Sequence, residues 1–389
     1  SPLFPYTTLF RSFTAYVGQY PKPGVEAPPA VNAIKIAEPI KRLNQPHLLR
    51  SPDGYLHVFV DYVPQNDIPG SHAGIIRYYR SERPDDITSL VDRTELLPDG
   101  DYGRYHLRLN VGVSRDGKRA ALVVLAYSLD GKDCLNIPLV LGGVRKGLDY
   151  DFQPPVRYAE VMSLFYPQVA VVDSGIVVVG QVWAGEVPGV IHRNVTARLM
   201  HLDWEGKLLH REDFPIVEDG SYSVFDMRPL DDNWTRLALM YNKVPLTKTG
   251  CRHELWQYDT KTQQTSLLWG ADINYNSANA GKWLPLEEGK SLFLNDPSMG
   301  QLRAWVGDFV GGGPIEQLEL PRTDPRLYGY AGNSYLSVPT PLNGSVSDPG
   351  SFYVMIDCLR ADRPAGSPDP CALLLYRLEV ELDKAEGES

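Results

Sequence analysis

Histidine, tyrosine and arginine recur beside the strands that the sequence predicts, and these side chains can move protons or hold an anion. The set consists of His72, Tyr105, His106, Tyr166, His192 and Arg193. Neutral histidine and tyrosine serve as general acids or bases. Arginine pairs with carboxylates through charge-assisted hydrogen bonds. The residue types therefore indicate proton-transfer chemistry on an anionic ligand.

His72 lies in a predicted β-hairpin within the stretch Leu48–Thr88. The hairpin opens at Pro52-Asp53-Gly54, which is a tight-turn signal. Alternating strands follow over Tyr55–Val63 and Ala73–Arg80, and the polar loop between them ends at Ser71-His72. A solvated or capping histidine explains His72 as well as a functional one does.

The other candidates have plain structural explanations too. Tyr105 and His106 are neighbours on a predicted strand, so at most one of them points into a cleft. Loop solvation alone would account for His192 and Arg193. His57 lies inside a strand, where a structural role is expected, and core packing explains Tyr78 better than sugar stacking does.

Composition indicates a globular all-β protein. The chain has 389 residues, with 43% hydrophobic and 22% charged, and its 34 glycines and 32 prolines favour many turns. Short alternating runs recur and long amphipathic helical windows do not. The net charge of −10 argues against nucleic acid. No apolar run is long enough to predict a transmembrane helix.

The strands recur in units of about 50 to 60 residues, a period typical of β-propeller blades. Six units are visible, and a seventh is conceivable from the N-terminal strand and the segment near 143–158. We therefore predict an all-β propeller, seven-bladed with six as the alternative; two β-sandwiches are the rival fold. The predicted ranges are a lead-in at 13–40, one propeller domain at 41–382 and a polar tail at 383–389.

The first unit resembles a known repeat. Pro52-Asp53-Gly54-Tyr55, then His72, then Tyr78-Tyr79-Arg80-Ser81 is similar to the opening blade of propellers built from sialidase-type (BNR) repeats. Within these, it resembles the branch that contains ulvan lyases and related polysaccharide lyases. The resemblance covers mainly residues 44–127, and the family's Tyr-Pro-Arg motif is absent from the second unit. Phe165-Tyr166-Pro167 is similar to the family's inner strand.

The resemblance implies β-elimination on a uronate-containing polysaccharide. Such a reaction needs a partner for the sugar carboxylate, a base for the adjacent proton and an acid for the leaving oxygen. We expect His72, His106, Tyr105 and Tyr166 to be catalytic. We expect Arg193, His192, Tyr78 and Arg80 to bind the substrate.

Two other functions remain open. A glycoside hydrolase would use a carboxylate pair, for which the sequence offers Asp61, Asp101, Glu160, Asp173 and Asp226. A non-catalytic glycan- or protein-binding propeller would bind without turnover. We expect no nucleic acid or membrane partner, and a monomer. The hypothesis of a structural divalent cation (Ca or Zn) stays open, although the sequence shows no recognisable cluster of metal ligands.

The N-terminal residues and the cysteines give little information about the fold or the function. Residues 3–12, LFPYTTLFRS, look like the translation of a sequencing adaptor, so residues 1–12 are left out of the fold prediction. We expect a secreted or periplasmic protein from the type of substrate. Cys358 and Cys371 flank a short loop and could form a disulfide; free thiols are equally consistent.

Overall fold

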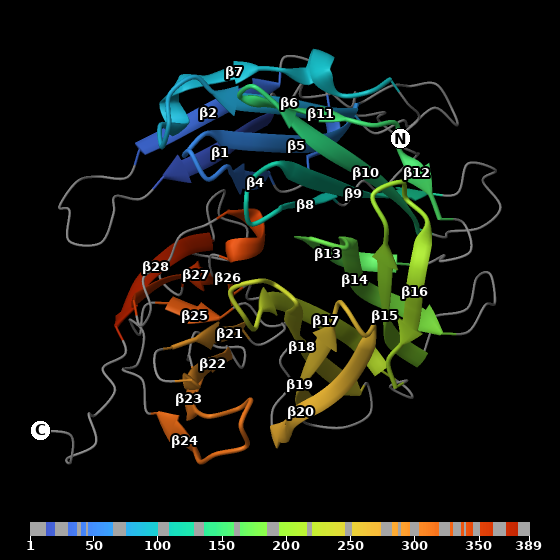
Figure 1. Ribbon diagram of the computed structural model, residues 1–389. Helices are drawn as coiled ribbons and strands as arrows, with labels where there is room; N and C mark the ends of the chain where they lie inside the picture. Colours follow the sequence, from blue (N-terminus) through green and yellow to red (C-terminus); the bar gives the residue numbers. More distant parts are fainter. Residues whose placement is uncertain are drawn as a thin grey trace, which may run out of the picture. The chain divides into compact units, whose positions relative to one another are not determined.

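The computed structural model of the chain (Figure 1) is built from β-strands and short 3₁₀ turns. It describes residues 13–19, 30–36, 40–43, 46–64, 75–99, 109–127, 136–158, 164–184, 194–215, 220–245, 251–273, 282–286, 289–295, 303–318, 327–329, 336–337, 340–344, 351–360 and 371–379. Over these ranges there is no α-helix, and the 3₁₀ turns include η1 (Ile87–Ser89), η2 (Thr94–Leu96) and η5 (Pro341–Asn343). No helix in these ranges has the length and apolar character needed to cross a membrane.

The chain divides into two compact units, Ser1–Phe165 and Tyr166–Ser389. The first unit begins with a two-stranded sheet of β1 (Phe13–Gln19) and β2 (Ala30–Ile36). The next sheet has the order β3 (Ile40–Leu43), β5 (Leu56–Pro64), β6 (Ile75–Ser81), β7 (Leu90–Asp92), with β4 (His47–Arg50) also on β5. The third has the order β8 (Leu109–Val113), β9 (Arg119–Tyr127), β10 (Asn136–Lys146), β11 (Asp149–Phe152), with β12 (Val156–Arg157) also on β10.

The same four-residue turn, Ser-x-Asp-Gly, joins the first strand to the second in both larger sheets of this unit. Ser51 Oγ donates to Asp53 at 2.6 Å between β4 and β5. Ser114 Oγ donates to Asp116 at 2.8 Å between β8 and β9. The closing glycines, Gly54 and Gly117, have φ of 92° and 69°, the left-handed region that glycine tolerates best. The local sequence therefore fixes both reversals of the chain.

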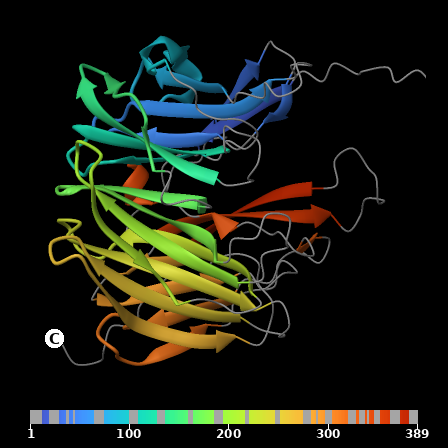
Figure 2. The same ribbon diagram turned by 90° about the vertical axis from the view of Figure 1, so that its right-hand side faces the viewer.

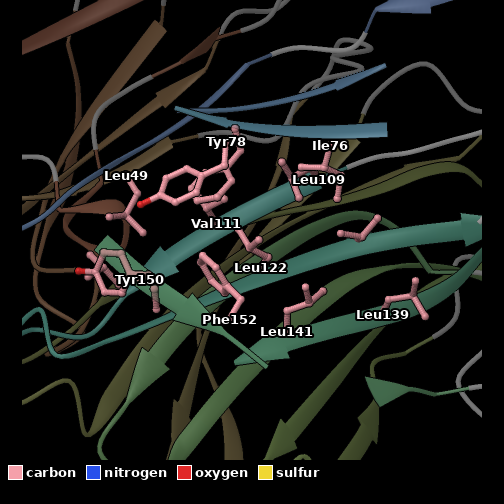
Figure 3. Close-up of a cluster of buried hydrophobic side chains, with 14 residues drawn as sticks. Leu49, Ile76, Tyr78, Leu109, Val111, Leu122, Leu139, Leu141, Tyr150 and Phe152 are labelled. Carbon is pink, nitrogen blue, oxygen red and sulfur yellow. The ribbon is translucent and has the colours of Figure 1, made fainter. Parts of the chain in front are cut away.

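The core of the first unit lies between the β3–β7 and β8–β12 sheets, as Figure 3 shows. Tyr78 stacks on Phe59 with ring centroids 4.8 Å apart, and Phe152 meets both rings edge-on. Ion pairs at the margin join the same two sheets: Arg80 Nε lies 2.6 Å from Asp149, and Arg145 pairs with Asp53. The two sheets are thus held by an apolar centre and a charged margin.

The described residues of the second unit form four antiparallel sheets. The first three keep the order of the chain: β13 (Leu164–Val172), β14 (Gly175–Ala184), β15 (Asn194–Leu202), β16 (Leu208–Asp213); β17 (Gly220–Pro229), β18 (Arg236–Pro245), β19 (Cys251–Asp259), β20 (Gln264–Ile273); β21 (Lys282–Pro285), β22 (Ser291–Asn295), β23 (Arg303–Gly307), β24 (Ile315–Leu318). The last has the order β25 (Leu327–Gly329), β27 (Ser351–Arg360), β26 (Leu336–Ser337), with β28 (Cys371–Glu379) also on β27. Figure 2 shows β17 to β20 running side by side.

Apolar clusters fill the space between neighbouring sheets of this unit. One cluster joins the β13–β16 and β17–β20 sheets through residues such as Leu199, Met227 and Tyr241, with Leu342 of η5 at its side. Another joins the β17–β20 and β21–β24 sheets through Met240, Trp283 and Phe293 among others. The β13–β16, β17–β20 and β21–β24 sheets thus bury apolar faces against one another, which is how stacked repeat units become stable.

The predicted all-β class is confirmed, and successive four-stranded meanders have the organisation of propeller blades. The blade number and the single domain over 41–382 stay predictions. One detail changes: the segment near 143–158, proposed as part of a seventh blade, completes the β8–β12 sheet. Strand β10 pairs with β9 from Asn136↔Tyr127 to Val144↔Arg119. Residues 1–12 lie outside the described ranges.

Two glycines of the first unit allow the stability cost of backbone strain to be measured apart from the cost of a steric clash. Gly117 and Gly147 have φ of 69° and 63°. A Cβ at Gly117 would lie 2.2 Å from Pro52 Cδ, whereas a Cβ at Gly147 would meet nothing within 4 Å. We expect Gly147→Ala to lower the free energy of unfolding by about 1 kcal/mol, the cost of the left-handed backbone. Gly117→Ala should cost about 2 kcal/mol more, because the two turns must move apart.

Urea unfolding of the two variants and the unchanged protein measures this difference. Equal losses in the two variants would show that the turns do not pack on one another.

Candidate functional site

Most of the predicted site residues lie outside the described ranges: His72, Tyr105, His106, His192 and Arg193. Tyr166 is the third residue of β13, and its backbone alone is described. Their places in the sequence, next to described strands, are nevertheless informative. Each of the β3–β7, β8–β12 and β13–β16 sheets has two ends. At one end the first strand begins and the second strand connects to the third, and we call this the loop end. We call the opposite end the turn end.

In the sequence, all six of these residues are close to a described strand end that lies at a loop end. His72 falls between β5 and β6 in the sequence, and Tyr105 and His106 shortly precede β8. His192 and Arg193 directly precede Asn194, which pairs with Ala184 at the loop end of the β13–β16 sheet. Tyr166 is close to the start of β13. The predicted residues are therefore neighbours, in the sequence, of the same kind of strand end in each sheet.

Tyr78 and Arg80, predicted to bind substrate, have structural roles instead. The Tyr78 side chain is 0% exposed, and its hydroxyl hydrogen-bonds Nδ1 of His57 at 2.7 Å. Arg80 is 5% exposed, and its guanidinium donates to Asp149 and to the Ser81 carbonyl. No sugar reaches either group, because both are covered between two sheets. The core packing expected for Tyr78 is confirmed.

His57 is buried in the same place. Burial, helped by the positive charges of Arg145 and Arg80, lowers its pKa to about 3. Burial also raises the pKa of the Tyr78 hydroxyl. Both groups are therefore neutral at physiological pH. His57 contacts Tyr150 edge-on at 4.9 Å, so it is a structural histidine of the sheet interface.

A buried charged cluster marks the first strands of two sheets in the second unit. Asp226 and Arg228 lie two residues apart on β17, so they share one face of the strand. Lys282 is the first residue of β21. Both Lys282 Nζ and Arg228 Nε lie 3.1 Å from the Asp226 carboxylate. Between them, Met227 turns to the opposite face and joins the apolar core.

The cluster keeps Asp226 ionised. Burial alone would raise the pKa of this carboxyl, but the charges and hydrogen bonds of Lys282 and Arg228 outweigh burial and lower it. An ionised carboxylate cannot supply the proton that a leaving glycosidic oxygen needs, so Asp226 is excluded as a general acid at neutral pH. A base, a nucleophile or a positioning role remains chemically open to it.

Of the other four carboxylates predicted for a hydrolase, the structure describes two, Asp61 and Asp173, and they lie in different units. Asp61 is buried on β5 and Asp173 is exposed in the β13–β14 turn. Asp101 and Glu160 lie outside the described ranges. Within the part of the chain that is described, no group of three or more His, Cys, Asp or Glu side chains could hold a metal ion. The divalent cation stays a prediction.

Comparison with known proteins gives distant structural likenesses. No family model and no curated protein matches the sequence. The α-L-arabinofuranosidase Arb93A from Fusarium graminearum has a TM-score of 0.47 at 10% identity, over 94% of this chain and 98% of that one. The polysaccharide lyase Uly1 has a TM-score of 0.49 at 11% identity, over 90% and 83%. The Trypanosoma rangeli sialidase has a TM-score of 0.46 at 12% identity, over 95% and 58%.

Asp226 was among the carboxylates predicted for a hydrolase, but its partners Arg228 and Lys282 were not predicted. A signal was present for Arg228: two charges spaced by two residues in a strand that also carries buried apolar residues indicate a charged buried face. Nothing in the sequence pointed to Lys282, which is 56 residues away.

We expect Asp226→Asn to lower the free energy of unfolding by about 3 kcal/mol at pH 7, because it removes the carboxylate that pairs with the buried Arg228 and the partly buried Lys282. A lowered pKa contributes stability above the ordinary value of 3.8, and this contribution is lost as the pH falls through the lower folded-state pKa. The difference between variant and unchanged protein should therefore shrink in acid.

Urea unfolding at neutral and acidic pH tests this expectation. Asp173→Asn, at an exposed position, is the control and should change stability little. An Asp226→Asn protein as stable as the control at pH 7 would contradict the assigned cluster.

Proposed function

We propose that this chain is a lyase that cleaves a uronate-containing polysaccharide by β-elimination. The proposed general acid and base are His72 and His106, with Tyr105 or Tyr166 as a further proton donor or base. The proposed partner of the sugar carboxylate is Arg193, beside His192. The proposal includes an anionic polysaccharide as partner, a monomeric state and a secreted or periplasmic location.

Support comes from the sequence positions of these residues relative to the described strands. Residue types that β-elimination requires are close, in the sequence, to strand ends at the loop ends of the β3–β7, β8–β12 and β13–β16 sheets. They precede or begin first strands, or fall in the sequence between second and third strands. Arginines and tyrosines within the sheets instead make structural contacts: Arg80 forms an ion pair and Tyr78 packs in the core.

The chemistry then divides by residue type. Withdrawal of the proton beside the carboxylate builds negative charge, which an arginine at the carboxylate stabilises. A neutral histidine accepts that proton, and a tyrosine or a protonated histidine donates one to the leaving oxygen. No bond to the enzyme forms, and the product carries a double bond in its terminal uronate.

We expect His72→Ala to abolish the ultraviolet absorbance increase that accompanies formation of unsaturated uronates, with the fold retained. The reason is that the variant lacks an imidazole for proton transfer, while the strands on both sides are unchanged. Lys118→Ala is the control, because Lys118 is an exposed residue at the turn end of the β8–β12 sheet. It should keep full activity.

A His72→Ala protein as active as the Lys118→Ala control would remove His72 from the mechanism. Circular dichroism of both variants shows whether each retains its β-structure, so that loss of activity is not mistaken for loss of fold.

A glycoside hydrolase is the second candidate, and the contacts of the Asp226 carboxylate with Lys282 and Arg228 are the observation that favours it. A carboxylate held ionised on the first strand of a sheet suits a base or nucleophile. Its products would be saturated sugars with new reducing ends. Reducing-sugar release without a rise in ultraviolet absorbance would therefore select the hydrolase, and binding without either signal would select a non-catalytic propeller.

A further inference from the structure

Serines occupy the turn ends of three sheets, but one of them has a different partner. In the first unit, Ser51 and Ser114 each donate to an aspartate of their own turn. In the second unit, Ser174 lies in the β13–β14 turn, is exposed, and has its Oγ 3.1 Å from Nε2 of His201. The third serine thus meets an imidazole where the other two meet a carboxylate.

His201 is built into the structure from both sides. It lies on β15, is 0% exposed, and its Nδ1 is 2.8 Å from the hydroxyl of Tyr258 on β19 of the next sheet. Burial, with a contribution from the nearby His210, lowers the pKa of His201 to about 4. Burial also raises the pKa of Tyr258. At neutral pH the imidazole is therefore uncharged, with one ring nitrogen available as an acceptor.

Other contacts fix the two outer members of this chain. The ring of His210 on β16 stacks on Tyr258 at 6.0 Å, with an interplanar angle of 18°. Trp204 Nε1 donates to the carbonyl of Asp173, the residue before Ser174, at 3.3 Å. The hydroxyl of an exposed serine, a buried neutral imidazole and a fixed phenol therefore form a continuous hydrogen-bonded chain across two sheets.

We propose that Ser174 is a nucleophile, with His201 as its general base and Tyr258 as a positioning residue, and that this site hydrolyses small carboxylic esters such as O-acetyl groups. None of these three residues is among the proposed lyase residues, and Ser174 lies at a turn end, whereas the lyase residues are close to loop ends in the sequence. The two activities do not depend on each other. The logic is that of a nucleophile, a base in hydrogen-bond reach and a third group that orients the base.

The reaction needs water alone as a second substrate. Ser174 Oγ bonds to the ester carbonyl carbon and passes its proton to His201 Nε2. The carbon–oxygen bond to the alcohol breaks, and the alcohol leaves with that proton. Water then attacks the acyl-serine and gives its proton to His201. The acid leaves, and the proton returns to Ser174. Tyr258 holds the imidazole with Nε2 toward the serine throughout.

The first test uses a fluorophosphonate probe and peptide mass spectrometry. We expect the Ser174 oxygen to displace fluoride from phosphorus, which leaves a phosphonyl adduct on the Ser174 peptide. The Ser51 and Ser114 peptides of the same digest are internal controls and should stay unmodified. Ser174→Ala should lose the adduct and the hydrolysis of p-nitrophenyl acetate. An unlabelled Ser174, labelling no faster than at Ser114, or ester hydrolysis retained in Ser174→Ala overturns the proposal.

The second test isolates Tyr258. Tyr258→Phe keeps the ring that stacks on His210 and removes the hydroxyl that orients His201, so we expect labelling at Ser174 to slow at least about tenfold. In the unchanged protein the labelling rate should be flat between about pH 6 and 8, because His201 is already neutral there. Thermal melting checks the fold of the variant. An unchanged labelling rate in Tyr258→Phe, or a rate in the unchanged protein that rises with hydroxide concentration, also overturns the proposal.

Discussion

One kind of contact recurs between the described sheets: a polar side chain that lies between two sheets meets a polar partner on the neighbouring sheet. In the first unit Arg80 reaches Asp149, and His57 lies against Tyr150. In the second unit Asp226 reaches Lys282, and His201 reaches Tyr258. An unpaired buried charge or donor costs several kcal/mol, so each of these pairs fixes the approach of two sheets. Packing and chemistry are therefore set by the same contacts.

The fold was predictable where alternation and turn chemistry agree. The predicted strands Tyr55–Val63 and Ala73–Arg80 agree within two residues with β5 (Leu56–Pro64) and β6 (Ile75–Ser81). The outermost strands were missed. β16, with the sequence LLHRED, alternates between partly buried and exposed positions, so its apolar signal is weak. β10 was missed for another reason: Pro138 and the pair Gly142-Gly143 interrupt a long strand that its pairing with β9 nonetheless sustains.

The candidate sites were less predictable than the strands, for a physical reason. A residue type shows what chemistry is possible, but its neighbours on other sheets decide whether that chemistry is available. The side chains of Tyr78 and Arg80 are of types that can bind sugars, but both make buried hydrogen bonds within the protein instead. His201 was not among the predicted site residues, since its partner Tyr258 is 57 residues away. Asp226 was named, but its ionised state depends on Lys282, which no local pattern indicates.

The buried imidazoles also set an acid limit for the whole chain. Burial lowers the pKa of His57 and His253 to about 3 and that of His201 to about 4, well below the ordinary value of 6.5. As the pH falls below 6.5, these histidines take up protons in the unfolded chain before they do so in the folded one, and folding free energy is lost at each of them. The protonation of aspartates such as Asp226 adds to this loss at still lower pH. Acid sensitivity is thus distributed over three sheet interfaces, and a more acid-tolerant form would replace these imidazoles with groups that do not titrate.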